Sequence, residues 1–315
     1  MPGRLRLASG ARQAHQIAMP DLYLATPTSP SLRLALEERF TVHDKNPPAT
    51  TRAIVGGGQL RLDAAMLDRL PALEIVAING VGYDGLDLDA LRARGVRVTT
   101  TPDVLTEDVA DLAIGLMLAV YRRIAANDAL VRGGGWKTPL GRRASGRRIG
   151  IFGLGKIGTA IAARAAPFAG ELLYTARAAK PVAWRYLPDI AALAEESDVL
   201  ILAAPGGAAT EKIVDADILK RLGADGVLVN VARGSLVDEP ALIAALQAGT
   251  IAGAGLDVFA DEPQVPAAFR GMEQVVLAPH QGSATAETRA AMAALVLANL
   301  DAHFAGRHLA TPLHF

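Results

Sequence analysis

The sequence contains no cysteine, so disulfides, thiolate metal ligands and cysteine nucleophiles are all excluded. Its six histidines do not follow the spacing of a zinc site. We therefore expect no bound metal. A chain without cysteine also suits a reducing compartment, and we predict a cytoplasmic protein.

An excess of charge is also lacking, because 32 lysines and arginines balance 32 aspartates and glutamates. Such a balance gives no reason to expect a nucleic-acid or anionic-membrane partner. The most apolar run, residues 112–120, is too short to span a bilayer and is preceded by Asp108 and Asp111. Residues 1–20 lack the apolar core of a signal peptide, and we interpret them as a flexible leader or an overextended start.

The length of 315 residues allows about two domains. From residue 21 to 98, short apolar runs alternate with amphipathic segments. The pattern predicts strands over 22–25, 52–55, 73–78 and 96–98, and helices over 31–38, 63–69 and 86–94. This βαβ alternation predicts an α/β domain with a parallel sheet that is complete before residue 100.

A second α/β pattern follows, with predicted strands over 148–152, 171–175, 199–203, 227–231, 251–256 and 274–277. Predicted helices cover 156–164, 215–221, 239–248 and 286–304. Another helix is expected after Thr106, its proposed N-cap, and should continue to Arg122 or beyond. Because this helix is apolar on more than one face, we expect burial on two sides, as in a subunit or domain contact.

The glycines Gly153, Gly155 and Gly158 follow the strand over 148–152 and open the next helix. Gly153 suits a tight turn, Gly155 lets a ligand approach the backbone, and Gly158 lets helix and strand pack closely. The free N–H groups of the helix start then face one spot that suits a pyrophosphate. The spacing alone is weak evidence, but the strand before it and the helix after it predict a dinucleotide site.

The residue that reads the ribose normally lies about 20 residues after the glycines, where an NAD enzyme has Asp or Glu. No acid occurs between residues 173 and 182, whereas Thr175, Arg177 and Lys180 do. Arg177 and Lys180 would neutralise a 2′-phosphate. We therefore predict NADPH or NADP as cofactor, with NADH or NAD as the weaker alternative.

Polar side chains follow three strands of the second domain: Arg233, Asp257 with Glu262 beyond it, and His280. All should face the cofactor crevice, although each alone has an ordinary structural explanation. In the first domain, the loops 55–58 and 79–83 are rich in glycine. Their N–H groups would hold a carboxylate, or the glycines simply make turns.

Six segments resemble motifs of the D-isomer-specific 2-hydroxyacid dehydrogenases, and the resemblance covers the chain from about residue 21. They are the fingerprint at 150–158 and the segments 81–84, 101–106, 230–234 and 257–263 with 279–285. The stretch 174–177 is most similar to the NADPH-dependent glyoxylate/hydroxypyruvate reductase branch. Gln281 and residues 206–209 depart from the family pattern.

The resemblance implies two Rossmann-like domains: a discontinuous substrate domain of residues 21–100 and 286–315, and a dinucleotide-binding domain of residues 101–285. It also implies a homodimer built around the helix after Thr106. Substrate contacts are expected from Gly57, Val81, Gly82, Arg233 and His280. Cofactor contacts are expected from Thr106, Leu154, Gly155, Lys156, Ile157, Thr175, Arg177, Lys180, Pro205, Thr210, Val231, Asp257, His280 and Gly282.

The implied reaction is reduction of a small 2-oxo acid, glyoxylate or hydroxypyruvate, to the D-2-hydroxy acid. His280 would give a proton to the developing alkoxide, and Glu262 would favour its imidazolium form. Arg233 would grip the substrate carboxylate, and Asp257 would accept from the nicotinamide carboxamide.

Three alternatives are considered. A larger acid such as an aryl pyruvate would keep the chemistry, with Trp136 and Tyr83 shaping the pocket, although loop aromatics also simply pack. A dinucleotide-sensing scaffold would leave the site residues without a catalytic task. Formate dehydrogenase chemistry is disfavoured, since those relatives have an amide in the place of Glu262.

Overall fold

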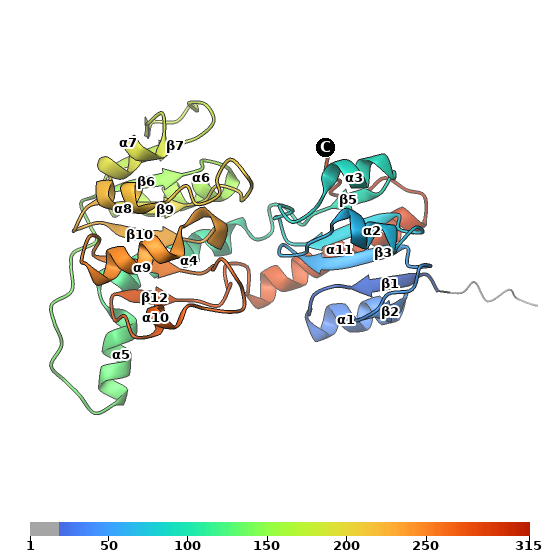
Figure 1. The fold of residues 1–315 in the computed structure, drawn as a ribbon, viewed down its shortest axis with the longest axis horizontal. Coiled ribbons are helices and arrows are strands. Elements are labelled where there is room, and N and C mark those ends of the chain that lie inside the picture. The colour runs from blue at the N-terminus through green and yellow to red at the C-terminus, as the bar shows by residue number, and fades with distance from the viewer. Residues whose placement is uncertain (1–18) are drawn as a thin grey trace, which may run out of the picture.

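The computed structural model describes residues 19–315, and in it two lobes lie side by side, each built on a parallel sheet (Figure 1). The fold class of two Rossmann-like α/β domains is thereby confirmed. Residues 1–18, within the predicted leader, lie outside the described residues. The domain boundaries inferred above remain a proposal.

The first sheet has the strand order β2-β1-β3-β4-β5, all parallel. Its strands are β1 (Asp21–Leu24), β2 (Thr41–His43), β3 (Ala53–Gly57), β4 (Ile75–Asn79) and β5 (Arg97–Thr99). Its helices are α1 (Pro30–Glu37), α2 (Ala64–Asp68) and α3 (Leu88–Ala93). Ser29, Asp63 and Asp87 cap these helices by accepting from the backbone N–H three residues later. Strand β2 was not predicted, because this edge strand includes the polar residues Thr41 and His43 and has no fully buried residue.

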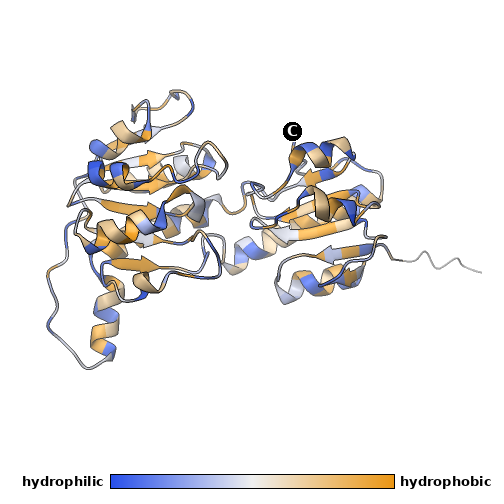
Figure 2. Ribbon diagram, in the orientation of Figure 1, coloured by the Kyte–Doolittle hydropathy of each residue, from blue (hydrophilic) through white to orange (hydrophobic). Residues whose placement is uncertain are grey.

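Both faces of the first sheet are covered, as expected of parallel strands. Ile54 and Val76 belong to the core shared with α2 and α3. Val55 and Ala77, one position further along their strands, belong to the opposite core, shared with α1 and the C-terminal helix α11 (Ala286–Phe304). Figure 2 shows the result as apolar strands enclosed by helices with mixed surfaces.

The second sheet has the strand order β12-β11-β10-β9-β6-β7-β8. Its strands are β6 (Arg147–Phe152), β7 (Ala169–Thr175), β8 (Arg185–Tyr186), β9 (Val199–Leu202), β10 (Val227–Asn230), β11 (Gly253–Leu256) and β12 (Val275–Leu277). The order reverses at β6, which pairs with β7 on one side and β9 on the other. In open α/β sheets, ligands bind at such a switch point.

Helices cover the second sheet on both faces. They are α4 (Thr106–Tyr121), α6 (Lys156–Ala165), α7 (Ile190–Glu195), α8 (Ala216–Leu222), α9 (Glu239–Gln247) and α10 (Ala267–Arg270), with a 3-10 turn, η1 (Gly234–Leu236). Helix α5 (Ile124–Arg132) follows α4 but has no buried residue and belongs to neither core. The short elements α7, α10 and β8 were not predicted, since packing rather than periodicity defines them.

The start and end predicted for helix α4 were wrong. Thr106 is its first residue, not its N-cap; the N-cap is Leu105, which makes no side-chain cap bond. Asp103, with a left-handed φ of 72°, turns the chain into the helix one turn earlier, and Thr106 N–H donates to its carbonyl. At the other end the helix stops at Tyr121, because Arg123 adopts a left-handed φ of 53° before α5 starts.

Helix α4 is buried on two sides within this chain, between α6 and the sheet. Two glycines of β11 make this packing possible. A Cβ on Gly255 would lie 2.9 Å from the Cβ of Leu116, and one on Gly253 would lie 2.8 Å from Val120. The second domain therefore accounts for most of the apolar surface of α4.

Helix α11 and the segment after it bring the C-terminal part of the chain back to the first lobe. Figure 1 shows α11 starting between the lobes and running beneath the first sheet. Val296 and Leu300 of α11 lie in the core of that sheet. Beyond the helix, the N–H of Leu313 donates to the carbonyl of Val98 in β5.

Candidate active site

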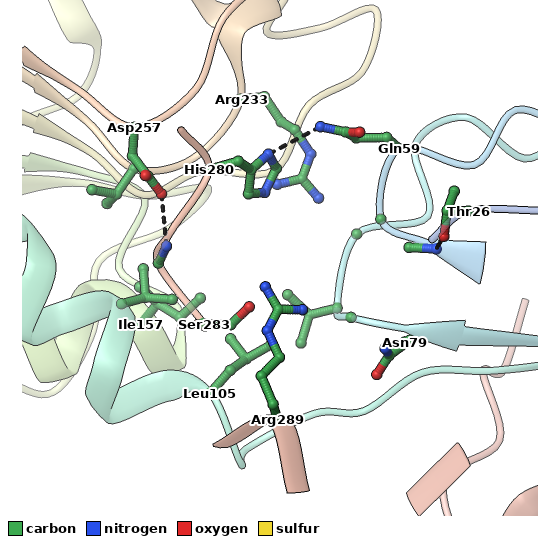
Figure 3. A pocket seen from close by; sticks show the side chains of 18 of the residues that line it. Thr26, Gln59, Asn79, Leu105, Ile157, Arg233, Asp257, His280, Ser283 and Arg289 are labelled. Atoms are coloured by element: carbon green, nitrogen blue, oxygen red, sulfur yellow. Dashed lines mark hydrogen bonds between the residues drawn. The ribbon is translucent and has the colours of Figure 1, made fainter. Parts of the chain in front are cut away.

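A cavity of about 280 Å³ lies between the two lobes, at the carboxyl ends of both sheets. The first lobe lines it with the loops after β1, β3 and β4, and the second with the loops after β10, β11 and β12 (Figure 3). Parallel strands bring these loops to one edge of each sheet. The cavity collects all five predicted substrate residues, namely Gly57, Val81, Gly82, Arg233 and His280.

The glycine turn after β6 has the geometry that its spacing predicts. Gly153 has a left-handed φ of 98°, and a Cβ there would come within 2.6 Å of the backbone nitrogen of Ala204. A Cβ on Gly158 would lie 2.0 Å from the carbonyl oxygen of Gly153. Gly155 is different, because a Cβ there would meet nothing within 4 Å. The turn thus leaves open space beside bare backbone.

This space fits the phosphates of a dinucleotide. Gly155 is the N-cap of α6 and provides no side-chain cap, so the first N–H groups of the helix are left for a ligand. Leu154 is buried beneath the turn, and Ile157 lines the cavity. A second hollow of about 290 Å³ continues from Ile157 past Pro205 and Val231, as a bound cofactor would require.

The residues predicted at the far end of the cofactor lie outside both hollows. Arg177 and Lys180 are exposed in the loop after β7, and neither side chain forms an ion pair among residues 19–315. Thr175 is buried, and its hydroxyl faces the carbonyls of Leu187 and Asp189 at 3.0 and 3.1 Å. The threonine hydroxyl is thus engaged by the protein, whereas the two basic side chains remain accessible.

Three other predicted cofactor residues make contacts with the protein itself. Lys156 pairs with Asp103 and points to solvent. The hydroxyl of Thr210 donates to the carbonyl of Pro205 at 2.9 Å. Thr106 opens α4 and does not line the cavity. Their role toward a cofactor remains a prediction.

His280 and Glu262 form the central pair of the site. His280 Nδ1 lies 2.8 Å from Glu262 Oε2, and the other carboxylate oxygen accepts from the N–H of Phe259. A left-handed φ of 54° at His280 turns the ring into the cavity. Because Nδ1 is used by the carboxylate, Nε2 remains for a ligand.

Burial favours the neutral form of Glu262, but the hydrogen bonds from His280 and Phe259 outweigh it. The pKa of Glu262 therefore lies below its ordinary value, and the residue is a carboxylate at neutral pH. A carboxylate at Nδ1 fixes the ring orientation and stabilises positive charge on the imidazole.

Arg233 faces the same cavity from the loop after β10. Its Nε donates to Asp84 Oδ1 at 3.1 Å and its Nη1 to the carbonyl of Ala232. The guanidinium lies directly on Gly82, where a Cβ would be 1.4 Å from Nη2. Gly82 is thus glycine because the arginine occupies the place of a side chain.

Two buried polar side chains hold the loops that carry Arg233 and His280. Asn230 donates to the carbonyl of Arg233 at 2.8 Å and accepts from the N–H of Ala232. Asp257 accepts from the N–H groups of Gln281 and Gly282 at 2.6 and 2.8 Å. Burial raises the pKa of Asp257, and these two amides oppose the rise. Asp257 therefore anchors the histidine loop, a role that its sequence position did not reveal.

Sequence reasoning missed three further residues at the cavity. Asp84 pairs with Arg233 across the lobes, and the side-chain amide of Gln59 contacts Glu262 and lies 3.1 Å from His280 Nδ1. Arg289 reaches the cavity from α11. Asp84 and Gln59 are next to the glycine-rich loops in the sequence, and this position could have marked them as site residues. No comparable sequence signal marked Arg289.

No group of three or more His, Asp or Glu residues that could hold a metal occurs in residues 19–315. Among the same residues, no helix is both long and apolar enough to cross a membrane.

Comparison with known proteins gives a consistent result. The family described as D-isomer specific 2-hydroxyacid dehydrogenase, NAD binding domain, matches residues 114–282. A glyoxylate/hydroxypyruvate reductase A of Arabidopsis thaliana is 49% identical over 302 residues, which cover 91% of this chain and 96% of that one. A hydroxyphenylpyruvate reductase of Plectranthus scutellarioides is 50% identical over 266 residues, with 83% and 85% covered.

A solved structure shows the same arrangement over most of the described residues. The NADPH-dependent glyoxylate/hydroxypyruvate reductase from Sinorhizobium meliloti, in complex with NADP and malonate, superposes with a TM-score of 0.88. The two sequences are 43% identical, and the match covers 94% of this chain and 97% of that one.

The glycine turn allows a matched test. Gly155→Ala adds a methyl group in open space, so we expect an unchanged melting temperature of the ligand-free protein but dinucleotide binding weakened about 10-fold or more, as hydrogen bonds to phosphate are lost. Gly158→Ala forces a clash with Gly153 and should destabilise the protein by about 1–3 kcal/mol. Thermal unfolding and cofactor-fluorescence titration measure the two effects. Equal destabilisation by both changes would contradict this description of the turn.

Proposed function

This chain belongs to the D-isomer specific 2-hydroxyacid dehydrogenase family, and we propose that it reduces glyoxylate or hydroxypyruvate to the D-2-hydroxy acid with NADPH. The observation that carries the proposal is the position of the His280–Glu262 pair, which shares one cavity with Arg233 beside an open dinucleotide turn. Relatives at 49% and 43% identity that are described as glyoxylate/hydroxypyruvate reductases support the substrate class.

In this mechanism, the Gly153–Gly158 turn would hold NADPH, which would be the source of the hydride for the keto carbon. Arg233 binds the substrate carboxylate with its Nη2, which has no partner among residues 19–315 and lies over Gly82. The N–H of Gly57 already donates to the hydroxyl of Thr26, so the backbone N–H groups of Val81 and Gly82 would receive the other carboxylate oxygen. A guanidinium and amides set around one anion fix the orientation of the carbonyl.

His280 holds the proton that the product hydroxyl requires. Its Nε2 gives this proton to the oxygen as negative charge develops there. Glu262 keeps the ring in place through Nδ1 and stabilises the charged imidazole before transfer. Asp257 acts through the loop, since its bonds to Gln281 and Gly282 set the position from which His280 reaches the substrate.

The preference for NADPH rests on the loop after β7. It has two accessible basic side chains, Arg177 and Lys180, and no acid from residue 173 to 182. A carboxylate at this place would bind the ribose hydroxyl of NADH and repel a 2′-phosphate. The S. meliloti relative is described as NADPH-dependent and in complex with NADP, in agreement with this preference.

Reduction of an aryl pyruvate is the second candidate, because a hydroxyphenylpyruvate reductase is 50% identical to this chain. The cavity itself favours the smaller acids. Its lining includes Arg233, Arg289, Gln59 and Asn79, and among residues 19–315 no phenylalanine, tyrosine or tryptophan lines it.

We also propose a homodimer in the cytoplasm. Large apolar side chains project from α5 and the loop that follows, including Trp136, 86% exposed, and Leu140, 95% exposed. Figure 1 shows this segment standing away from the body of the second lobe. A patch of this kind favours association with another protein surface.

The reaction is tested by a steady-state comparison of glyoxylate, hydroxypyruvate and phenylpyruvate with NADPH. We expect the highest kcat/KM for one of the two small acids. His280→Ala should lower kcat by about 100- to 10,000-fold, because the general acid is lost, with NADPH affinity changed far less. If wild-type protein turned over none of these acids, the family relationship would persist but the proposed activity would be rejected.

Arg177→Ala tests the cofactor preference. We expect the Kd for NADPH to rise about 10- to 100-fold, since a charge-assisted hydrogen bond to the 2′-phosphate is lost. The Kd for NADH should change little, because NADH has no phosphate there. Equal losses for both cofactors would show that Arg177 does not read the phosphate.

Sedimentation equilibrium tests the oligomer. A homodimer has twice the chain mass of 32.8 kDa. We expect Trp136→Glu with Leu140→Glu to produce the monomer mass, because two buried, unpaired charges oppose association. A wild-type monomer at micromolar concentration would contradict the proposal.

A further inference from the structure

Arg289 is a second arginine in the substrate cavity, and neither the motifs nor the proposed reaction gives it a task. It lies near the start of α11 and lines the cavity together with Arg233 and His280. Figure 3 shows its side chain rising from the helix into the space that His280 and Arg233 also face. Helix α11 belongs to the core of the first sheet, so this cation is fixed to the substrate lobe.

The guanidinium of Arg289 has no hydrogen-bond or ion-pair partner among residues 19–315, although the residue is partly buried. Most other arginines at element ends are paired; Arg164, for example, bridges Glu107 and Asp111. Arg233, in the same cavity, is held by Asp84. A partly buried cation without a counterion favours binding of an anion or of electron-rich oxygen.

The position of Arg289 along its helix strengthens this argument. Thr285 is the N-cap of α11, which makes Arg289 the fourth residue of the helix. The helix dipole places partial positive charge at this end, so a cation there costs about 0.3–1 kcal/mol instead of stabilising the fold. Both the helix start and the guanidinium therefore present positive potential to the cavity.

The lining also contains a hydroxyl near the start of α11. Ser283 lines the cavity together with Arg289, and Figure 3 shows both side chains at the same end of it. A hydroxyl can donate to a substrate oxygen, as a guanidinium does, so the two residues suit a substrate part that carries oxygen.

The two arginines differ in what they would meet on one substrate molecule. Arg233, like His280, lies in a loop of the second lobe, and it is assigned to the carboxylate adjacent to the carbonyl. Asp257 is the one carboxylate in the lining, and both of its oxygens accept loop amides. The positive charge of Arg289 would therefore still lack an anionic partner after a 2-oxo monocarboxylate with an apolar tail has bound.

We infer that Arg289 is a specificity residue that binds the end of the substrate remote from the reacting carbonyl. It favours 2-oxo acids whose tail carries a carboxylate or hydroxyl oxygen over acids of the same size with an apolar tail. This inference rests on the proposed function, since it places a 2-oxo acid in the cavity.

Two substrate pairs isolate the tail. Hydroxypyruvate and 2-oxobutyrate have the same number of heavy atoms and differ in a hydroxyl against a methyl group. Oxaloacetate and 4-methyl-2-oxopentanoate differ in a carboxylate against two methyl groups. In the wild type we expect the oxygen-bearing member of each pair to have the higher kcat/KM, mainly through a lower KM.

Arg289→Met keeps an unbranched, flexible side chain and removes the guanidinium charge. We expect the ratio of kcat/KM for oxaloacetate to that for 4-methyl-2-oxopentanoate to fall about 10- to 100-fold, the effect of one charge-assisted hydrogen bond. Arg289→Lys should recover part of this ratio. Arg307→Met, which removes an exposed arginine beyond the end of α11, should leave it unchanged.

A binding measurement separates this inference from the reaction itself. Calorimetric titration of oxaloacetate and 4-methyl-2-oxopentanoate into protein with bound NADP requires no turnover. A selective loss of oxaloacetate affinity in Arg289→Met supports the subsite even if the wild type reduces none of these acids, an outcome that would reject only the proposed function. Equal losses for both acids, or no loss for either, would overturn the inference.

Discussion

The hydrogen bonds that Asn230 and Asp257 make at the ends of neighbouring strands are the constraint on which the site depends. Each side chain is buried, and each holds the backbone of a loop that carries a functional residue: Asn230 the turn of Arg233, Asp257 the loop of His280. The N–H of Asp257 also donates to the carbonyl of Asn230, and its own carbonyl accepts from His280. Guanidinium and imidazole are thereby positioned by one continuous set of bonds within the second sheet.

The first lobe completes the site with glycine loops that present their backbone to the cavity. Gly82 lies under the guanidinium of Arg233, and the loop at Gly57 exposes its backbone at the cavity. Asp84 and Gln59 then reach across to Arg233 and to the His280–Glu262 pair. The charged groups thus come mainly from one lobe and the amide groups from the other, so the full constellation exists only where the lobes meet.

Periodicity and the carboxyl ends of strands are local signals, and they predicted the two sheets and the glycine turn. The joint role of Arg233, Glu262 and His280 was predicted from the family resemblance. The sequence alone did not predict the anchoring role of Asp257, since accepting two loop amides depends on how a later loop folds back. Arg289 was missed for a similar reason: a lone arginine in a helix resembles any solvated charge until the helix is placed against a cavity. The error at Thr106 arose because Asp103 turns the chain before a threonine cap is needed.

The route of α11 has a consequence for synthesis on the ribosome. The face of the first sheet that receives Val296 and Leu300 is made by strands finished before residue 100, yet its cover is translated nearly 200 residues later. At about 5–20 residues per second, this interval lasts roughly 10–40 s. During that time the nascent amino-terminal segment exposes an apolar surface, a natural target for a holding chaperone. All strands of the second sheet precede α11 in the chain, so the second domain can fold before the first is complete.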